Sequence, residues 1–425
     1  MKNTGYTIFE TFVGAGGSHI GFMRENFKTV YVNDFVDTCL QTLKFNNLNL
    51  EEEKTVFDNT PIEKINSKKL QKELELETGE LDVMFGGVVC KGFSLAGERS
   101  PNDTRNTLYR KQLELVDQFK PKISIVENVP GIINAKIIRT DTPNEIKEEI
   151  NVLWEELSKF KGQKASLRKA NQLTKEFENK GIELRKEKER ILKYLDDENY
   201  LISVIDDIKL IYDKIGYKVT YQVLNAAWYG SATKRERVFI VAVRNDIKET
   251  FEFPEPQYMD EKIFKKGMDI KLLDLPNPMT VNQALESIDY SDEKDIDNIP
   301  MSHKEKTIER FKYIPEGESI SDHIDKLPED LKISKFYSRG STMRLDGNSP
   351  SPTLVPGHSN FPVHPKEHRS ITVREAAAIT GFPNSYKFFG NHTKRCEHVG
   401  NAVPPNLSQV LAKECNRILD KFYTK

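Results

Sequence analysis

Short apolar runs alternate with helical patterns through the first third of the chain, and this alternation constrains the fold more than any other feature. Residues 6–9 and 29–32 are typical of strands, and helices are expected from Ser18 and again through Leu40. A strand, a helix and a second strand in succession favour parallel pairing, because the helix returns the chain to the same edge. The pattern predicts an α/β fold with a doubly wound, mostly parallel sheet.

Two segments interrupt this pattern. Between about 135 and 200, charged residues dominate and apolar residues recur at spacings of three and four, which predicts an inserted helical hairpin. From about 255 to 368, proline, aspartate and weak strand signals indicate a small irregular domain. We therefore expect a catalytic and cofactor-binding domain over 1–254, a second domain over 255–368, and a segment over 369–425 that completes the first.

Composition narrows the class of protein. The 425 residues carry a net charge of -2 with 30% charged residues, which fits a soluble globular chain large enough for two domains. No apolar stretch is long enough to span a membrane, and the N-terminus has no secretory pattern. Four well-separated cysteines disfavour a disulfide framework or a zinc site, so a reducing cytosol is expected. The small net charge still allows DNA binding through a local basic cleft.

A glycine-rich turn follows the first expected strand. It contains Phe12, Gly14, Gly16 and Gly17 and precedes a helix. Glycines at such a turn let the backbone bend tightly and approach a ligand closely. The turn is therefore a candidate site for a nucleotide-type cofactor, with an ordinary strand-to-helix turn as the alternative.

Acidic residues after the next two strands strengthen the cofactor interpretation. Asp34 follows the second strand, where a carboxylate can accept both hydroxyls of a ribose. Phe35 beside it can stack on an adenine, and Asp58 or Asn59 is a candidate for the adenine amino group. The alternative for Asp34 is a helix N-cap.

A cysteine and a carboxylate follow two further strands. Cys90 lies on a glycine-flanked turn after the strand at 81–85, and Glu127 ends the strand that begins at Ile123. A thiolate is nucleophilic when nearby positive charge or a helix end lowers its pKa. A buried carboxyl has a raised pKa and suits general-acid work. Together they indicate covalent chemistry on an electron-poor ring, against the alternatives of a buried apolar cysteine and a surface glutamate.

At these positions the chain resembles the cytosine-C5 DNA methyltransferases, over residues 6–134, 200–250 and 370–425. The resemblance rests on four short motifs. They are Gly86-Gly87-Val88-Val89-Cys90-Lys91-Gly92-Phe93-Ser94, Glu127-Asn128-Val129, Thr233-Lys234-Arg235-Glu236-Arg237 and Gly400-Asn401-Ala402-Val403-Pro404-Pro405. The resemblance implies a Rossmann-like methyltransferase fold with S-adenosylmethionine as cofactor.

The resemblance also implies roles for individual residues. Cys90 would attack C6 of cytosine, which turns C5 into an enamine carbon able to accept a methyl group, while Glu127 supplies a proton or strong hydrogen bond at N3. Arg235 and Arg237 would hold the base and support Glu127, since alternate residues entering a strand point the same way. The cofactor would lie on the glycine turn and Asp34. Asn401 and Ala402 would close over its methionine part.

The implied substrate is duplex DNA, recognised by the segment 255–368. The target cytosine must leave the stack, and the loop from Ser94 to Arg105 is suited to close over the DNA. Side chains expected to contact bases or phosphates, or else to be surface residues, are Lys91, Ser94, Arg99, Arg105, Arg339, Arg344, His358 and His364. A bacterial or phage modification enzyme is the expected setting, in the cytosol or nucleoid, with a restriction endonuclease for the same site as a further partner.

Four residues depart from the family pattern. Val89 and Lys91 stand where proline and glutamine are usual, and Thr233 and His398 replace glutamines. Val89 loses the rigid turn of proline, whereas Lys91 adds positive charge near the sulfur. Two alternatives stay open: a tRNA cytosine-5 methyltransferase on the same core, and a DNA-binding homologue without catalysis. The long segment after residue 255 argues against the tRNA enzyme.

Overall fold

A seven-stranded sheet forms the centre of the molecule, in a computed structural model that describes residues 5–47, 49–52, 54–88, 100–103, 107–333, 340–357 and 361–424. The strand order is β3-β2-β1-β4-β5-β9-β8. The bounds are β1 Thr7–Thr11, β2 Lys28–Asn33, β3 Val56–Asp58, β4 Val83–Gly87, β5 Ile123–Asn128, β8 Tyr217–Asn225 and β9 Glu236–Arg244. Neighbours from β3 to β5 pair in parallel, whereas β9 runs antiparallel to β5 and β8. The predicted mostly parallel α/β sheet is confirmed.

The strand order reverses between β1 and β4. The chain builds the sheet outward from β1 through β2 to β3, and then returns to add β4 and β5 on the other side. Ligands of such sheets bind where the order reverses, outside the carboxyl ends of the strands. The glycine turn follows β1, and residue 88, which leads toward Cys90, follows β4. The topology therefore brings the glycine turn and the residue that leads toward Cys90 to the same edge of the sheet.

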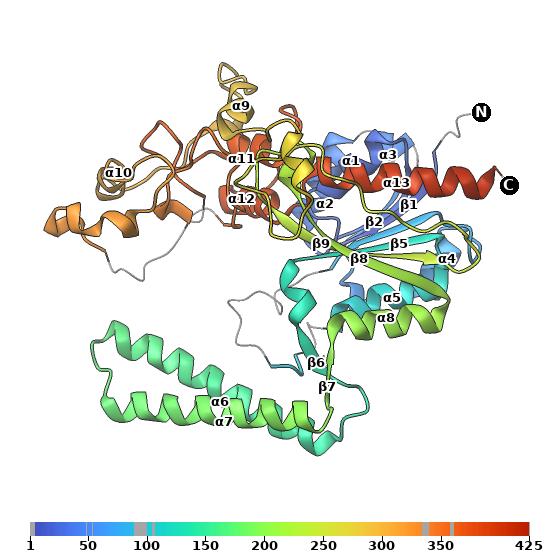
Figure 1. Cartoon of the computed structure of the whole chain (residues 1–425), viewed down its shortest axis with the longest axis horizontal. Helices are drawn as coiled ribbons and strands as arrows, with labels where there is room; N and C mark the ends of the chain where they lie inside the picture. Colours follow the sequence, from blue (N-terminus) through green and yellow to red (C-terminus); the bar gives the residue numbers. More distant parts are fainter. Residues whose placement is uncertain are drawn as a thin grey trace.

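Helices cover both faces of the sheet (Figure 1). One apolar core joins α1 and α13 to the sheet, and a second joins α5 and α8 to its other face. The helices of this domain are α1 Gly17–Arg24, α2 Asp37–Asn46, α3 Asn49–Glu52, α4 Ser67–Glu73, α5 Leu108–Phe119, α8 Val204–Ile215 and α13 Pro405–Tyr423. The C-terminal helix therefore packs against the first helix.

The predicted helical hairpin is present. It consists of α6 (Asn144–Lys169) and α7 (Lys175–Asp197), which project away from the main sheet in Figure 1. The expected apolar stripes meet in a separate small core formed by Ile150, Leu153, Trp154, Leu184, Ile191 and Leu195, together with Ile138. A two-stranded antiparallel sheet that the sequence did not predict, β6 (Lys136–Ile138) and β7 (Leu201–Ser203), joins the hairpin to the rest.

The segment after residue 255 is mainly loops and short helices. Its helices α9 (Val281–Glu286) and α10 (Glu305–Phe311) were not predicted, nor was α12 (His392–Asn401) beyond it. Between them and α12 lies α11 (Val373–Thr380). Short 3₁₀ helices complete the chain: η1 Ile62–Lys64, η3 Pro130–Asn134, η4 Ala226–Tyr229, η5 Ile270–Asp274, η6 Ile296–Asn298, η7 Ile320–Lys326, η8 Glu329–Leu331 and η9 Gly340–Thr342. Across the described ranges, no helix is both long and apolar enough to cross a bilayer.

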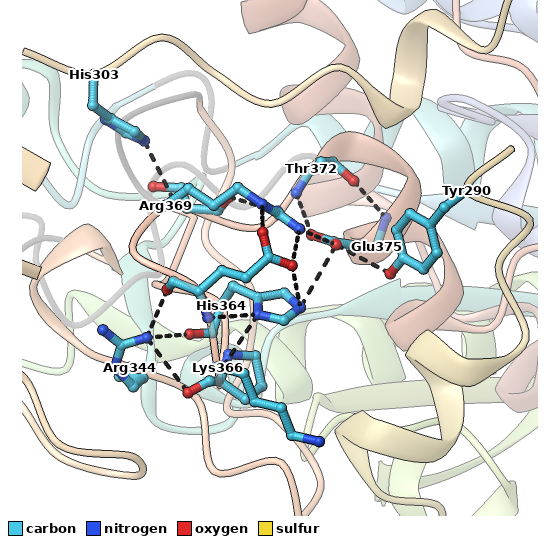
Figure 2. Close-up of polar contacts among 11 residues, drawn as sticks. Tyr290, His303, Arg344, His364, Lys366, Arg369, Thr372 and Glu375 are labelled. Carbon is cyan, nitrogen blue, oxygen red and sulfur yellow. Dashed lines mark hydrogen bonds and ion pairs between the residues drawn. The ribbon is translucent and has the colours of Figure 1, made fainter. Parts of the chain in front are cut away.

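Buried ion pairs fasten this segment to α11. Arg374 of α11 is 1% exposed, and its Nε lies 2.7 Å from Asp295 Oδ2. Glu375, also buried, accepts hydrogen bonds from both Nη atoms of Arg369 and from the hydroxyl of Tyr290 (Figure 2). Because broken buried ion pairs leave uncompensated charges, these contacts fix the position of the segment on α11.

Candidate active site

Glu127 and two arginines lie together at the carboxyl end of β5. Arg237 Nε is 2.7 Å from Glu127 Oε1, and Arg235 is buried beside them. Burial raises the pKa of Glu127, and the positive charges of Arg237 and Arg235 offset part of this rise. A carboxyl with a raised pKa keeps its proton to higher pH than an exposed glutamate does, which suits a general acid.

The second carboxylate oxygen of Glu127, Oε2, faces the end of β4. Gly87 pairs with Glu127 in the parallel register, and a Cβ built on Gly87 would lie 3.5 Å from Glu127 Oε2. The next residue, Val88, accepts a 3.4 Å hydrogen bond from Asn128 Nδ2. Glu127 therefore lies beside the start of the segment that carries Cys90. Cys90 itself, with Lys91, Ser94, Arg99 and Arg105, lies outside the described residues.

Arg235 carries an unused donor. Its Nη1 donates a 3.4 Å hydrogen bond to the carbonyl of Leu354, but its Nε has no partner among the described residues. Burial lowers the pKa of Arg235, and the neighbouring Arg237 lowers it further. A buried donor without a partner is costly, so its presence in this group favours a site that a ligand completes.

Asp34 links the glycine turn to the end of β2. Its two oxygens accept hydrogen bonds from the backbone of Gly14 and of Val36, both at 2.9 Å. Burial raises the pKa of the Asp34 carboxyl, and these two hydrogen bonds offset part of the rise. The N-cap of α2 is Val36, so Asp34 is not the N-cap of that helix.

The glycine turn leaves room for a ligand. Gly14 has a φ of 56°, and a Cβ at this position would meet nothing within 4 Å. Phe35, next to Asp34, is 60% exposed. The turn therefore combines open space at Gly14 with a carboxylate and an exposed aromatic ring, which are groups that can hold a nucleoside. Phe12, at the start of the turn, has the left-handed φ of 51°, which is rare for a residue with a Cβ.

The C-terminal motif closes the other side of this turn. A Cβ on Gly17 would lie 2.1 Å from the carbonyl oxygen of Val403 and 3.2 Å from Ala402 Cβ, so only glycine allows this contact. Gly16 has a φ of 90°, and a Cβ on it would lie 2.6 Å from the hydroxyl oxygen of Tyr386. This hydroxyl donates to the carbonyl of Ala15 at 2.7 Å. The structure thus brings Ala402 against the glycine turn, while Asn401 is exposed at the end of α12.

Asp58 joins the same edge through β3. It accepts hydrogen bonds from the Tyr31 hydroxyl at 2.7 Å and from the backbone of Thr60 at 2.8 Å. Burial alone would raise the pKa of Asp58, but these hydrogen bonds outweigh it, and the pKa is lowered. Its backbone carbonyl accepts from the N–H of Asp34 at 3.2 Å. Asp58 therefore remains an ionised carboxylate next to Asp34.

Sequence reasoning missed a polar group beneath the turn. Glu10 in β1 is fully buried and accepts a hydrogen bond from Ser18 Oγ at 3.0 Å, and His19 Nδ1 lies 2.9 Å from its other oxygen. The signal was an acidic residue inside an apolar strand run, which requires buried partners. The group connects β1 to the start of α1, and so it helps to fix the turn between them.

Arg344 and His364 correct the sequence prediction of DNA contacts. Arg344 is 4% exposed, and its guanidinium donates to the backbone carbonyls of Phe311, Ile314 and Glu367. It also donates to the backbone carbonyl of His364 (Figure 2). His364 Nδ1 accepts from two backbone N–H groups, and burial lowers its pKa. Both side chains stabilise the surrounding loops, because their polar atoms form hydrogen bonds with the loop backbone. Arg339 and His358 lie outside the described residues.

The sequence is similar to known proteins along most of its length. The sequence model of the C-5 cytosine-specific DNA methylase family matches residues 6–160 and 180–417, a wider span than the three predicted segments. The Type II methyltransferase M.DdeI of Desulfomicrobium norvegicum is 26% identical, over 96% of this chain and 87% of the relative. M.Eco47II of Escherichia coli is 25% identical, over 99% of this chain and 81% of the relative.

Solved structures share the fold. A candidate DNA modification methyltransferase encoded within an E. coli prophage aligns with a TM-score of 0.60 and 20% identity, over 98% of this chain and 99% of that one. The Dnmt2 methyltransferase of S. pombe aligns with a TM-score of 0.50 and 13% identity, over 98% and 99% of the two chains. At these identities the likeness concerns the fold alone.

Proposed function

Because the chain belongs to the family of C-5 cytosine-specific DNA methylases, and is a DNA cytosine-5 methyltransferase that uses S-adenosylmethionine, we propose that it methylates a flipped-out cytosine in a specific duplex sequence through a covalent cysteine adduct. Cys90 is the nucleophile and Glu127 the acid at N3. The segment 255–368 recognises the sequence. The setting is a Type II restriction–modification system, like that of the named relatives, with an endonuclease for the same site.

The observation that carries the proposal is the group of Glu127, Arg235 and Arg237. One oxygen of the Glu127 carboxylate pairs with Arg237. The other oxygen faces Gly87, at the start of the segment that carries Cys90. A structural ion pair would satisfy all three side chains, yet Arg235 Nε has no partner among the described residues. A cytosine in this space would receive hydrogen bonds on N3 and O2 from groups already in place.

The proposed reaction follows from these positions. The thiolate of Cys90 forms a bond to C6, and the ring electrons move toward C5 while Glu127 supplies a proton or strong hydrogen bond at N3. S-adenosylmethionine supplies the methyl group. Water then takes the C5 proton, Glu127 takes back any proton held at N3, and the bond between Cys90 Sγ and C6 breaks with its electrons on sulfur. These changes restore the aromatic ring and the thiolate. Arg237 keeps Glu127 oriented, and Arg235 holds the O2 side of the base.

The cofactor site in this proposal is the edge between β1, β2 and β3. Asp34 binds the ribose hydroxyls, Phe35 stacks on the adenine and Asp58 lies near the adenine amino group, while Gly14, Gly16 and Gly17 provide the close backbone approach with Phe12. Asn401 and Ala402 cover the methionine part. The open space above Gly14 and the exposure of Phe35 support this placement.

The test is methyl transfer from labelled S-adenosylmethionine to unmodified duplex DNA, followed by bisulfite mapping. We expect label at C5 of cytosine in one short recurring sequence, absent in Cys90→Ala and retained in Cys415→Ala, which removes a buried thiol from α13. Label on tRNA and not on duplex DNA would refute the DNA substrate. Cofactor binding without label on either would indicate a non-catalytic homologue.

A second experiment tests the covalent step. Once the target sequence is mapped, 5-fluorocytosine placed at the target position blocks loss of the C5 substituent and should trap the adduct. We expect a complex between protein and DNA that survives denaturant, is absent in Cys90→Ala and is present in Cys415→Ala. A confirmed substrate that gives no trapped complex would rule out the cysteine adduct.

A further inference from the structure

The turn of the helical hairpin is strongly basic. Residues 161–175, called the basic turn below, contain five basic residues and no acidic residue in a chain whose net charge is -2. The basic residues are Lys161, Lys164, Arg168, Lys169 and Lys175. Lys161, Arg168 and Lys175 are exposed, and none of these three forms an ion pair with any described residue. The charge of the turn is therefore available to a partner.

Helix electrostatics explain only part of this charge. Cations in the last turn of α6 are favourable because they lie at the negative end of the helix dipole. Lys175, however, is the first residue of α7, where a positive charge is unfavourable. Other lysines of the hairpin do have partners, since Lys159 pairs with Glu155 and Lys180 with Glu156. Within the hairpin, the basic turn is the part of the sequence without acidic residues.

The turn also lies outside the part of the chain that the family model matches. The matched segments end at residue 160 and resume at residue 180. The hairpin core on both sides still packs well, because Phe160 stacks on Phe177 at 4.4 Å between ring centroids and a Cβ on Gly181 would strike the Phe160 ring. The basic turn thus lies outside the matched residues and is flanked by packed aromatic side chains.

The root of the hairpin touches the loop expected to close over DNA. The backbone N–H of Ile138 in β6 donates to the carbonyl of Pro101 at 3.2 Å, and Asn102 Nδ2 donates to Asn151 Oδ1 of α6 at 3.0 Å. Pro101 and Asn102 belong to the loop from Ser94 to Arg105. In Figure 1 the hairpin and the segment with α10 project to the same side of the main sheet. The hairpin therefore begins beside residues 101 and 102, which belong to the loop that closes over DNA in the proposed function.

We propose that the hairpin is an arm whose basic turn binds the phosphate backbone of the substrate duplex beside the target site. This inference rests on the proposed function. The 18 residues from Asn151 to Lys169 span about 27 Å at 1.5 Å per residue, which corresponds to about eight base pairs at 3.4 Å each. The arm holds flanking DNA without reading its sequence, because phosphate contacts add affinity and salt dependence but no base specificity.

The experiment compares two triple variants on two duplexes. Lys161→Ala, Arg168→Ala and Lys175→Ala together remove exposed charge from the basic turn. Lys64→Ala, Lys68→Ala and Lys72→Ala remove three exposed lysines from the region of η1 and α4 and serve as the matched control. Affinity is measured by fluorescence anisotropy over a range of salt, on duplexes of about 12 and about 40 base pairs centred on the mapped site.

We expect the hairpin variant to bind the long duplex about tenfold weaker at about 100 mM salt, with a salt slope smaller by about 0.9 for each lost phosphate contact. Binding to the short duplex and single-turnover methyl transfer on saturating DNA should match the parent, as should all properties of the control. Equal affinity and slope for parent and hairpin variant on the long duplex would overturn the inference. A loss of equal size on both duplexes, or on tRNA alone, would overturn it too.

The results separate this inference from the proposed function. A parent that methylates DNA while the hairpin variant binds the long duplex normally leaves the function standing and refutes the arm. A parent that transfers no methyl group but binds the long duplex through the basic turn supports the arm and refutes the function.

Discussion

Arg237 of β9 holds the carboxylate of Glu127 of β5 with 2.7 Å between Nε and Oε1. Glu127 pairs with Phe239 in the antiparallel register, so Arg237 lies two residues away, on the same face and diagonally opposite. This geometry depends on β9 running antiparallel to β5 and β8. Because of that direction, β9 starts at the edge of the sheet where β5 ends. The reversed strand delivers both arginines to the carboxyl end of the sheet.

Glu127→Gln tests the acid role of this carboxyl. Glutamine retains the size of the side chain but cannot supply the proton, so we expect the rate of methyl transfer to fall by about 10² to 10⁴. The affinity for S-adenosylmethionine should remain within about twofold, since the cofactor site lies on other strands. Single-turnover kinetics and calorimetric titration measure the two quantities.

The control for this variant is Glu236→Gln, in the neighbouring position to Arg237 on β9. It should leave both the rate and the cofactor affinity near their parent values. Equal losses of rate and of cofactor affinity in Glu127→Gln would show that Glu127 supports the structure and does not act in the reaction.

The raised pKa of Glu127 also predicts a dependence of stability on pH. Burial disfavours the charged carboxylate in the folded protein, so its folded pKa lies above its unfolded value. The contribution of this group to stability is fully present below the unfolded pKa of about 4.3 and is lost as pH rises through the folded pKa. Glu127→Gln removes this loss. The variant should therefore gain stability relative to the parent as pH increases.

Urea unfolding of the two proteins without cofactor or DNA, at several pH values from about 4.5 to about 8, measures this difference. Other carboxyls with shifted pKa values, such as Asp34 and Asp297, are common to both proteins and cancel in the comparison. A difference in the free energy of unfolding that stays constant with pH would show that Glu127 is ionised throughout the range.

Asp34→Ala should weaken the cofactor site. The change removes the acceptor for the N–H groups of Gly14 and Val36 and, in the proposed function, for the ribose hydroxyls. We expect the affinity for S-adenosylmethionine to fall at least tenfold, which is about 1.4 kcal/mol. Asp34→Asn keeps one acceptor oxygen and should give an intermediate loss of affinity.

Isothermal titration measures the affinity of both variants for S-adenosylmethionine, with Asp37→Ala, which removes an exposed carboxylate, as control. Reduced stability with parent-like cofactor affinity would limit Asp34 to a structural role.

Local sequence patterns predicted the main sheet well because its strands are apolar runs of five or six residues at the positions of β1, β2, β4 and β5. β6 and β7 are three residues each, too short for a period to appear. α12 was missed because its sequence is mostly polar, with Cys396 and Val399 as its buried apolar side chains.

The site shows the same division between local and distant information. The glycine turn and Asp34 each follow a strand, and Glu127 lies near the end of one. Their order in the chain therefore predicts a common edge of the sheet. Contacts across long separations have no local signal: Gly17 meets Val403 near the opposite end of the chain. Arg344 was predicted wrongly for this reason, since its charge suggests a surface and only the folded loops around it show that it is buried.

Arg344→Lys distinguishes a structural arginine from a phosphate contact. Lysine keeps the charge but not the planar fork that donates to the carbonyls of Phe311, Ile314 and Glu367. Buried carbonyls without donors cost about 1 to 3 kcal/mol each, so both Arg344→Lys and Arg344→Ala should lower the free energy of unfolding by about 3 kcal/mol or more. Thermal unfolding and limited proteolysis of the segment 255–368 measure this effect.

The control is Lys366→Ala, which changes an exposed neighbour and should alter neither the unfolding temperature nor the rate of proteolysis. A lysine variant with parent-like stability and DNA affinity, beside an alanine variant with a smaller salt slope, would instead place Arg344 on the DNA.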